Sequence, residues 1–364
     1  MLVTAIEARP VRSLDRVRVE LEPGIVSVVG PNGVGKTNLV EALYFALTGR
    51  SFRTSDRRDL IPFGGKLARA EATVRDGDGL ERRLLASVSR TEGRRHLLDG
   101  SPADPSTLSR SRPPVAVFAP DRLTLVKGPP SERRAHLDGF ASARWPSRTE
   151  LRKRYGQALA QRNALVSRVA AGHRTEADLD VWDVGLAEAA APLIATREEA
   201  ISELAAPFST AAAELGLEGG ATLEYAPRAS GSAEEIRAGL EERREQDIRM
   251  GRSSWGPHLD ELKIATGGRS LRRYGSQGQQ RAALLALLFA EREVLLAARQ
   301  VTPLLLLDDV MSELDPGRRE RLVGRLGDGG QALITAADEE SVPAAALRSV
   351  VRMPPPQMPS AAAA

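Results

Sequence analysis

The sequence contains no cysteine, so disulfide bridges and thiolate metal sites are both excluded. It also lacks a long apolar run: the longest strongly apolar stretch, residues 282–290, lies between Arg281 and Glu291 and is too short to span a bilayer. No basic and then apolar leader opens the chain. The net charge is only +3, which by itself gives no electrostatic indication of nucleic acid. We therefore expect a cytoplasmic protein, with room for two domains in 364 residues.

Residues 30–37 read GPNGVGKT, which matches the G-x-x-x-x-G-K-T pattern of the phosphate-binding loop of nucleoside triphosphatases. The apolar run 25–29 before this loop has the β-branched bias of a buried strand. Apolar residues after the loop recur at helical spacing until Gly49, a predicted helix C-cap. Strand, glycine loop and helix form the context that a working loop requires. The alternative is a glycine-rich turn before a core helix.

The loop predicts binding of ATP with Mg²⁺. Its backbone N–H groups are expected to surround the β-phosphate at the positive end of the helix dipole. Lys36 is expected to reach the β- and γ-phosphate oxygens, and Thr37 to ligate Mg²⁺. The loop residues that we assign to nucleotide binding are Gly30, Asn32, Gly33, Gly35, Lys36, Thr37 and Asn38.

Alternating and helical patterns divide the rest of the chain. Alternation on either side of the turn at residues 76–79 predicts an antiparallel meander, whose arginines lie on a solvated face or, alternatively, along a phosphate-contacting edge. Helical patterning follows, and strand character returns near residue 222. We predict an N-terminal ATPase half at 1–114, an inserted helical arm at 115–215, a C-terminal ATPase half at 216–352 and a disordered tail at 353–364.

Capping residues and prolines give finer predictions within the arm. Asp121 and Ser131 are placed as helix N-caps, and Ser147 is expected to open a long helix. Pro192 and Pro207 are expected to kink or break the alanine-rich stretch that contains them.

Four leucines at 304–307 lead directly into Asp308 and Asp309. A fully apolar run of this length predicts a central parallel strand, and ligands bind at the carboxyl ends of such strands. We therefore expect Asp308 to hold Mg²⁺ together with Thr37, and Asp309 to orient or deprotonate the attacking water. The alternative is a buried strand followed by an acidic turn.

Two further stretches narrow the class. YGSQGQQR, residues 274–281, opens a predicted long helix to Leu296 and resembles the S-x-G-Q signature of the ATP-binding-cassette superfamily. SELD, residues 312–315, follows the acidic pair where that superfamily has its D-loop. The resemblance implies that Ser276, Gly278, Gln279 and Asp315 complete a nucleotide site across a homodimer. The alternative for Ser276 is a plain helix cap.

Five stretches together resemble the bacterial RecF family of SMC-like recombination mediators: GPNGVGKTNLVEALYFALTGRSFR, KGPPSERR (127–134), GPHLDEL (256–262), YGSQGQQR and LLLLDDVMSELD. This resemblance implies an α/β fold, an ABC/SMC-like P-loop ATPase head in which a mixed sheet and an antiparallel meander carry an inserted helical arm. It also implies an ATP-dependent homodimer at the nucleoid, with no membrane. The implied partners are double-stranded DNA, gap junctions between duplex and single strand, RecR with RecO, and RecA downstream.

Three positions depart from transporter ATPases. No glutamine precedes Gln157, so a transporter-type Q-loop is absent; Asp309 stands where transporters use glutamate, and Thr335 where a switch histidine is expected. These departures favour a slow ATPase that acts as a clamp. A transporter's nucleotide-binding subunit and a small-molecule phosphotransferase remain alternatives. His258, within GPHLDEL, is either functional or a satisfied structural histidine. Trp255 beside it is expected to serve in packing, with base stacking as the alternative.

Overall fold

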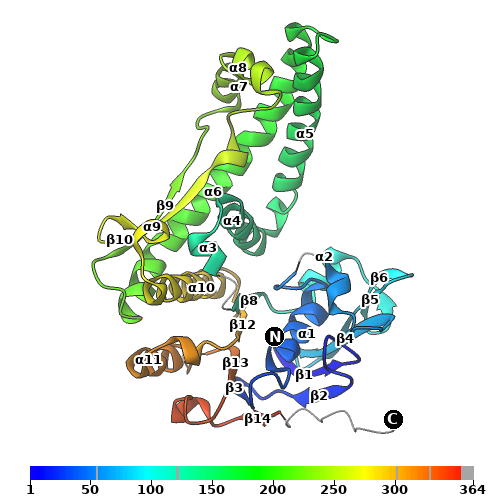
Figure 1. Cartoon of the computed structure of the whole chain (residues 1–364), viewed down its shortest axis with the longest axis vertical. Coiled ribbons are helices and arrows are strands. Elements are labelled where there is room, and N and C mark those ends of the chain that lie inside the picture. The colour runs from blue at the N-terminus through cyan, green and yellow to red at the C-terminus, as the bar shows by residue number, and fades with distance from the viewer. Residues whose placement is uncertain (55, 120–122, 301, 328, 354–364) are drawn as a thin grey trace, which may run out of the picture. The chain divides into compact units, whose positions relative to one another are not determined.

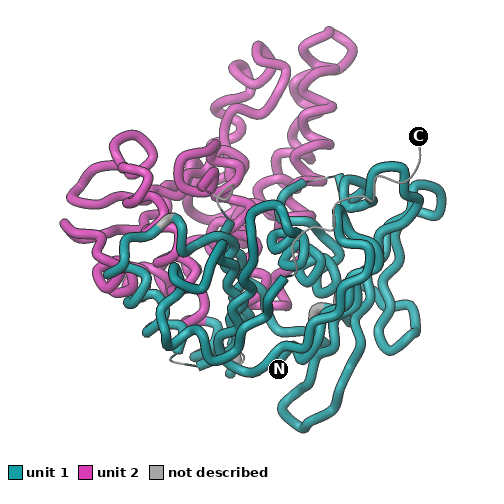
Figure 2. Tube along the Cα trace, turned by 60° about the horizontal axis from the view of Figure 1, so that its bottom comes forward, with its two compact units in different colours: residues 1–122, 295–364 teal, residues 123–294 magenta. Residues whose placement is uncertain are grey.

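The computed structural model describes residues 1–54, 56–119, 123–300, 302–327 and 329–353. The chain forms two compact units, coloured separately in Figure 2. Unit 1 comprises residues 1–122 and 295–364, and unit 2 comprises residues 123–294. Among the described residues, no helix combines the length and the apolar character needed to cross a membrane.

A five-stranded parallel sheet lies in unit 1, with the order β14 (Val350–Arg352), β3 (Gly24–Val29), β13 (Gln331–Ala336), β12 (Leu304–Leu307) and β8 (Val115–Phe118) (Figure 1). Every residue of β12 and β13 is buried. Strands that are covered on both faces need side chains that are apolar throughout, which explains the four consecutive leucines. The strands predicted at 25–29 and 304–307 are confirmed.

The second sheet of unit 1 is antiparallel, in the order β2 (Val17–Glu20), β1 (Leu2–Ala8), β4 (Leu67–Arg75), β5 (Glu81–Ser89), β6 (Gly93–Leu98) and β7 (Ser101–Pro102). The predicted meander is confirmed, and its turn at residues 76–79 joins β4 to β5. On β4, Ala68, Ala70, Ala72 and Val74 are buried while their neighbours are not, so the alternation in the sequence matches one buried face.

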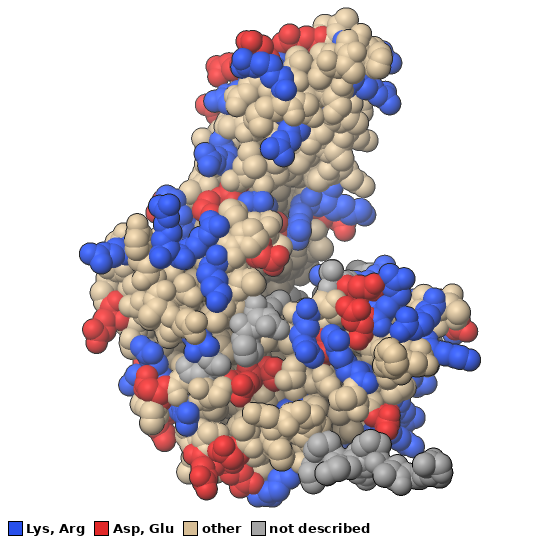
Figure 3. Space-filling model, viewed as in Figure 1, with Lys and Arg blue, Asp and Glu red and all other residues tan. Residues whose placement is uncertain are grey.

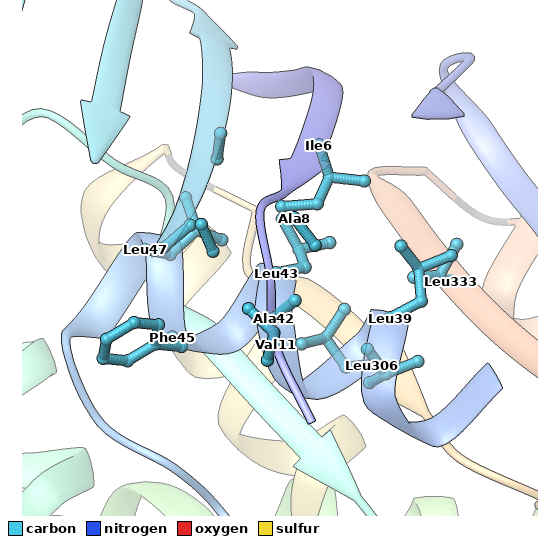
Figure 4. Close-up of a cluster of buried hydrophobic side chains, with 14 of the residues drawn as sticks. Ile6, Ala8, Val11, Leu39, Ala42, Leu43, Phe45, Leu47, Leu306 and Leu333 are labelled. Carbon is cyan, nitrogen blue, oxygen red and sulfur yellow. The ribbon is translucent and has the colours of Figure 1, made fainter. Parts of the chain in front are cut away.

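One apolar cluster joins α1 (Lys36–Thr48) to both sheets (Figure 4). Leu39 and Leu43 of α1 share this cluster with Ile6 of β1, Leu306 of β12 and Leu333 of β13. The helix ends at Gly49, whose φ of 65° and N–H bond to the Phe45 carbonyl confirm the predicted C-cap. The remaining helices of unit 1 are α2 (Pro105–Arg110), α11 (Pro316–Gly327) and the single turns η1 (Arg57–Leu60), η6 (Met311–Glu313) and η7 (Ala344–Ala346).

Unit 2 combines helices with a small antiparallel sheet, ordered β11 (Arg269–Ser270), β10 (Glu261–Thr266) and β9 (Ala221–Ala226). Its helices are α3 (Thr124–Lys127), α4 (Pro130–Arg144), α5 (Leu151–Ala170), α6 (Asp180–Glu214), α7 (Ala233–Glu241), α8 (Arg244–Met250), α9 (Leu271–Tyr274) and α10 (Gln277–Arg299), the last of which continues into unit 1. The short turns η3 (Pro146–Arg148) and η4 (Glu176–Leu179) lie between helices, and η5 (Pro257–Leu259) lies between α8 and β10.

The observed units divide the chain differently from the predicted domains. Residues 216–294 lie in unit 2, although the sequence analysis assigned them to the C-terminal ATPase half. The reason is packing: β9 pairs with β10, and α6 packs against β9, so this segment shares its contacts with the arm. Residues 115–119 instead stay in unit 1, because β8 pairs with β12.

Several predicted helix starts are wrong by a few residues. Ser131 lies inside α4, which begins at Pro130, because proline suits a first helical position where no N–H bond is needed. Ser147 lies in η3, and the long helix α5 begins only at Leu151. The prediction that residues 274–281 open a long helix is confirmed, since α10 begins at Gln277 within this stretch and runs to Arg299 rather than to Leu296. Asp121 and the tail from residue 354 lie outside the described residues.

The two prolines of the alanine-rich stretch do not end its helix. Pro192 and Pro207 both lie within α6, which continues from Asp180 to Glu214. Buried side chains on either side of the prolines, including Leu193, Ile194 and Phe208, anchor the helix. Tertiary packing therefore outweighs the local penalty of proline.

Candidate nucleotide site

The loop between β3 and α1 has a backbone that requires glycine. Gly35 has a φ of 105°, and a Cβ there would lie 2.8 Å from Cδ2 of Leu14. Gly33 also has a positive φ, 85°. Both values favour glycine, because L side chains rarely adopt this region. The glycines thus let the loop turn tightly onto the start of α1, with Asn32 exposed at its outer side.

Lys36 lies buried at the first position of α1 and points back into the loop. Its Nζ donates to the carbonyl oxygens of Gly30, at 2.6 Å, and Pro31, at 3.0 Å. Burial lowers the pKa of Lys36, while Asp309 and Asp308 raise it in part. The loop therefore holds its cation against its own backbone, where it is available to an anion.

Thr37 and Asp308 meet as the sequence predicts. Thr37 Oγ1 donates to Asp308 Oδ1 at 3.0 Å, although 271 positions separate the two residues. Thr335, at the end of β13, donates from Oγ1 to the same carboxylate oxygen at 2.8 Å. The backbone N–H of Asp309 in turn donates to Thr335 Oγ1 at 2.8 Å. Because β13 lies between β3 and β12, Thr335 lies between the phosphate loop, which follows β3, and the two aspartates, which follow β12.

Asp308 carries a charge that its surroundings do not balance. The residue is 4% exposed, and burial raises the pKa of its carboxyl, to which the neighbouring Asp309 adds. The two threonine hydroxyls and the charge of Arg53 offset only part of that rise in pKa. Within the described part of the chain, no lysine or arginine forms an ion pair with Asp308. A buried carboxylate beside a hydroxyl suits a divalent cation.

The oxygen donors fit Mg²⁺ bound to a nucleotide better than an all-protein metal site. The described residues contain no cluster of three or more His, Cys, Asp or Glu side chains that could hold a metal ion. Mg²⁺ commonly uses one or two protein oxygens and takes its other ligands from phosphates and water. Thr37 and Asp308 offer such a pair.

Asp309 is held in an unusual backbone conformation. Its φ is 50°, in the left-handed region that few residues other than glycine adopt. The bond from its N–H to Thr335 and the bond from Ser312 Oγ to its carbonyl, at 3.0 Å, fix the peptide groups on both sides. Strain of this kind is concentrated at functional sites.

An arginine and glutamate cluster behind the loop was not recognised in the sequence. Glu41 of α1 is fully buried and accepts two bonds from Arg12, at 2.7 and 2.9 Å. Arg53 donates to Glu41 at 3.4 Å and to Asn38 Oδ1 at 3.1 Å. Asn38 also donates to Ser13 Oγ at 2.7 Å, so it ties α1 to segment 12–14. The only available signal was the GRSFR sequence, which includes Arg53.

The signature residues lie in unit 2, whereas the loop and the acidic pair lie in unit 1. Ser276 Oγ accepts from the N–H of Gln279 at 3.2 Å, and Gln279 Oε1 accepts from the N–H of Ser276 at 2.9 Å. This reciprocal pair caps α10, whose second residue is Gly278. Ser276 is exposed and its hydroxyl proton is not used by these two bonds, so capping leaves it able to donate to an anion.

Asp315 is also a helix cap. Its Oδ1 accepts from the N–H of Arg318 at 2.9 Å at the start of α11, and this bond lowers the pKa of the carboxyl. The side chain is exposed. The structure therefore places Asp315 at a surface, outside the contacts of Lys36, Thr37 and Asp308.

The two remaining motifs bind each other in unit 2. Arg133 of KGPPSERR pairs with both carboxylate oxygens of Glu261 in GPHLDEL, at 2.7 and 2.9 Å. Arg134 donates to the Asp260 carbonyl at 2.8 Å. Asp260 itself is fully buried and accepts from Arg197 Nη1 at 2.9 Å, from the N–H of Arg228 at 2.8 Å and from the hydroxyl of Tyr225.

His258 has partners that support its structural interpretation. Its Nε2 faces the Ser253 carbonyl at 3.2 Å, so Nε2 carries the proton and Nδ1 accepts from the Tyr155 hydroxyl at 2.7 Å. Burial lowers the pKa of the imidazole. Trp255 stacks under Arg243, with Cζ 4.6 Å from the ring centroid, and packs against Gly239, which agrees with its predicted packing role.

The fold defines the class of protein, together with the phosphate loop and the aspartates that lie beside it at the end of β12. The class is a P-loop ATPase head of the SMC type. Residues 2–357 match the family model described as RecF/RecN/SMC N terminal domain. The chain is 38% identical to the DNA replication and repair protein RecF of Streptomyces avermitilis, over 94% of this chain and 95% of that one. It is 36% identical to RecF of Anaeromyxobacter sp., over 95% of each chain. The chain therefore belongs to this family, and within it to the RecF proteins.

Solved structures agree with this assignment. A structure of the recombination mediator protein RecF with ATP, in the RecFOR pathway, is 28% identical and superposes with a TM-score of 0.84, covering 94% of this chain and 93% of the other. An Smc head bound to the C-terminal winged-helix domain of ScpA is only 17% identical, with a TM-score of 0.57, and is similar in fold alone.

Proposed function

We propose that this protein is an ATP-dependent DNA-binding protein of recombinational repair, in which ATP closes a homodimer and slow hydrolysis opens it. The observation that carries the proposal is the bond between Thr37 and Asp308, which brings the phosphate loop to an uncompensated buried carboxylate. When bound, ATP would supply the phosphoanhydride bond that is hydrolysed. Mg²⁺ would supply the positive charge that compensates the buried carboxylate.

Each residue of the site then has a defined task. Lys36 exchanges the loop carbonyls for phosphate oxygens, and the loop N–H groups orient the β-phosphate. Thr37 and Asp308 hold Mg²⁺, and Asp309 accepts the proton of the attacking water. Thr335 holds the two aspartates by hydrogen bonds and, unlike a histidine, offers no ionisable group at neutral pH. That difference supports slow hydrolysis.

The signature supports a site composed of two protomers. Ser276 and Gln279 cap a 23-residue helix through their own N–H groups, so the N–H of Gly278 and the serine hydroxyl form its anion-binding end. The partners that follow from membership among the RecF proteins are duplex DNA and gap junctions, RecR with RecO, and RecA loaded downstream.

Sedimentation with and without ATP and duplex DNA tests dimerisation and partner together. We expect wild type to sediment as a dimer with ATP and to bind DNA more tightly in that state. Lys36→Ala should remain monomeric, because no other cation would meet the phosphates. A wild type that stays monomeric with saturating ATP and DNA would contradict the clamp. Co-purification with a membrane partner would favour the transporter alternative.

Mixing two inactive variants tests the composite site. Ser276→Arg should bind ATP as a monomer but fail to close, because the large cation blocks the partner's γ-phosphate. In a heterodimer, its Lys36 and the Ser276 of a Lys36→Ala chain rebuild one complete site, so ATPase activity should partly recover. The assay needs high protein concentration and added DNA, since one clamp holds more weakly than two.

Ser232→Arg is the matched control for this experiment. Ser232 caps α7 with Glu235 through the same reciprocal pair of bonds, so the variant loses a comparable cap at a different helix. It should dimerise and hydrolyse ATP like wild type. Absence of recovery in the mixture, despite demonstrated heterodimers, would exclude the composite site.

A further inference from the structure

A hollow of about 660 Å³ lies on the outward face of the small sheet in unit 2. Its floor includes Thr222 and Glu224 of β9 and Glu261 and Lys263 of β10, and it is bordered by α3 and α9. The opposite face of β9, with Ala221 and Leu223, is buried. Figure 3 shows basic side chains gathered over β10 and α9.

The hollow has a surplus of positive charge. Its lining holds five cations, Lys127, Arg133, Lys263, Arg272 and Arg273, but only two carboxylates. Both carboxylates are already paired within the lining: Glu261 with Arg133 at 2.7 Å, and Glu224 with Lys263 at 3.0 Å. Three cations therefore remain to be neutralised.

The three surplus cations are exposed and have weak partners or none. Arg272 approaches Glu261 only to 3.9 Å, and that carboxylate is already bound by Arg133. Lys127 and Arg273 form no ion pair among the residues that the structure describes. Their free charges are therefore available to an anionic ligand.

The walls of the hollow are held in place before any ligand arrives. Arg133 donates to the carbonyls of Leu125, Val126 and Gly128, at 3.0 to 3.4 Å, while its other nitrogens bind Glu261. This one buried side chain joins the end of α3 to β10. On the other border, Leu271 of α9 is buried and its carbonyl accepts from Gln280 Nε2 at 2.9 Å. The cations thus project from a preorganised frame, which lowers the entropic cost of binding.

The lining favours a nucleic acid over a protein partner. Its larger apolar side chains, Val126, Leu262 and Ile264, are 1%, 3% and 5% exposed, so they offer no anchor to a protein. Protein interfaces usually depend on such anchors, whereas contacts to a nucleic-acid backbone depend on lysine and arginine. We propose that Lys127, Arg272 and Arg273 contact the phosphodiester backbone of DNA, an inference that rests on the proposed function and locates its DNA surface.

Salt-dependent binding to a duplex oligonucleotide tests this surface. The variant Lys127→Ala with Arg273→Ala removes two cations and leaves the paired floor intact. Because each lost phosphate contact lowers the slope of log affinity against log salt by about 0.9, the slope should fall by about two. Affinity near physiological salt should fall about tenfold or more. ATP-driven dimerisation should persist, since neither side chain belongs to the nucleotide site.

The matched control is Lys153→Ala with Arg249→Ala, the same change of charge at two exposed positions on α5 and α8. It should keep the slope and affinity of wild type. If the hollow variant also keeps them, the inference is wrong while the proposed function stands. If wild type itself does not bind duplex DNA, the proposed function fails first.

Since the chain has no cysteine, site-directed crosslinking gives a second measurement. A thiol-reactive photocrosslinker attached to the Ser270→Cys variant lies on the exposed rim of the hollow. The same reagent attached to the Ser202→Cys variant lies at an exposed position of α6. We expect DNA to crosslink to the first variant and not to the second. Equal or absent crosslinking, with both proteins bound to DNA, would overturn the inference.

Discussion

Two of the buried aspartates, Asp260 in unit 2 and Asp308 in unit 1, are stabilised in different ways. Asp260, in unit 2, is bound by Arg197, by the hydroxyl of Tyr225 and by a backbone N–H. Among the described residues, the carboxylate of Asp308, in unit 1, accepts only from the hydroxyls of Thr37 and Thr335. Burial of a carboxylate is unfavourable unless a cation and hydrogen bonds compensate it. Arg197 is that cation at Asp260, whereas no lysine or arginine of the described residues forms an ion pair with Asp308.

This difference is the one we expect between a structural carboxylate and a carboxylate proposed to bind a metal ion. The compensation of Asp260 joins α6, β9 and the GPHLDEL segment, and Asp138 holds the same arginine with two bonds, at 2.8 and 3.0 Å. At Asp308, the unbalanced charge beside the phosphate loop supports the proposed binding of Mg²⁺. Both aspartates lie in sequence motifs and both are buried. Their partners therefore distinguish them.

The largest expected effect follows from breaking the compensated site. Asp260→Asn leaves Arg197 buried with one carboxylate fewer and removes an acceptor from Tyr225. Loss of one partner of a buried ion pair lowers the free energy of unfolding by about 3–5 kcal/mol. We expect the lower end of this range, because Asp138 still pairs with Arg197. Urea denaturation of the full chain should show this loss, whereas Asp78→Asn in an exposed turn should not. A loss below about 1 kcal/mol would show that the network is not stabilising.

The same change at the uncompensated site should affect activity instead. Asp308→Asn removes a charge that burial makes unfavourable, so the free energy of unfolding without ligands should stay equal or increase. Mg²⁺-dependent ATP hydrolysis should fall by roughly 100-fold, because the proposed Mg²⁺ site loses the charge of Asp308. Much of the nucleotide binding should remain, as measured by titration with a fluorescent ATP analogue. Strong destabilisation together with normal hydrolysis would reverse the two roles.

An intermediate effect is expected from Thr335→Val, which removes the hydroxyl that links the two aspartates and keeps the shape of the side chain. One hydrogen bond to Asp308 and one from Asp309 are lost. The free energy of unfolding should fall by about 1–2 kcal/mol, and hydrolysis by about tenfold. Thr335→Ser should restore both quantities, which distinguishes loss of the hydroxyl from a change in packing. Full activity in Thr335→Val would exclude the linking role.

The sequence predicted the meeting of the loop and Asp308 better than the packing of the arm, for a physical reason. The loop, the leucine strand and Asp308 are local patterns whose meeting follows from the topology of a parallel sheet. The bidentate pair of Arg133 and Glu261 joins residues 128 positions apart, and no local pattern indicates it. Arginine patterns favour a solvated face, yet Arg133, Arg162 and Arg197 are nearly fully buried in unit 2.

The role of Thr335 shows the same limit within the site. The sequence marked it only as a departure from a switch histidine, because its contacts depend on β13 lying between β3 and β12. The continuity of α6 through Pro192 and Pro207 also depends on packing that local rules do not include. Strand patterns thus predict which residues reach the site, and long-range side-chain pairs decide how their charges are balanced.

The smallest expected effect is the dependence of stability on pH that the uncompensated Asp308 should produce. Burial raises the folded-state pKa of Asp308 above its ordinary value of 3.8, so the folded protein binds this proton more tightly than the unfolded chain does. The resulting stabilisation is complete below pH 3.8 and is lost as the pH rises through the folded-state pKa. Asparagine does not titrate. The stability of Asp308→Asn relative to wild type should therefore increase with pH over this window and then stay constant, by about 1.4 kcal/mol for each unit of raised pKa. Urea denaturation between about pH 4 and pH 8 measures the difference. Added Mg²⁺ and ATP should reduce it, because the cation then compensates the carboxylate in wild type alone. A difference that is flat in pH, or that shrinks as the pH rises, would show that burial does not raise the pKa of Asp308 in the folded protein.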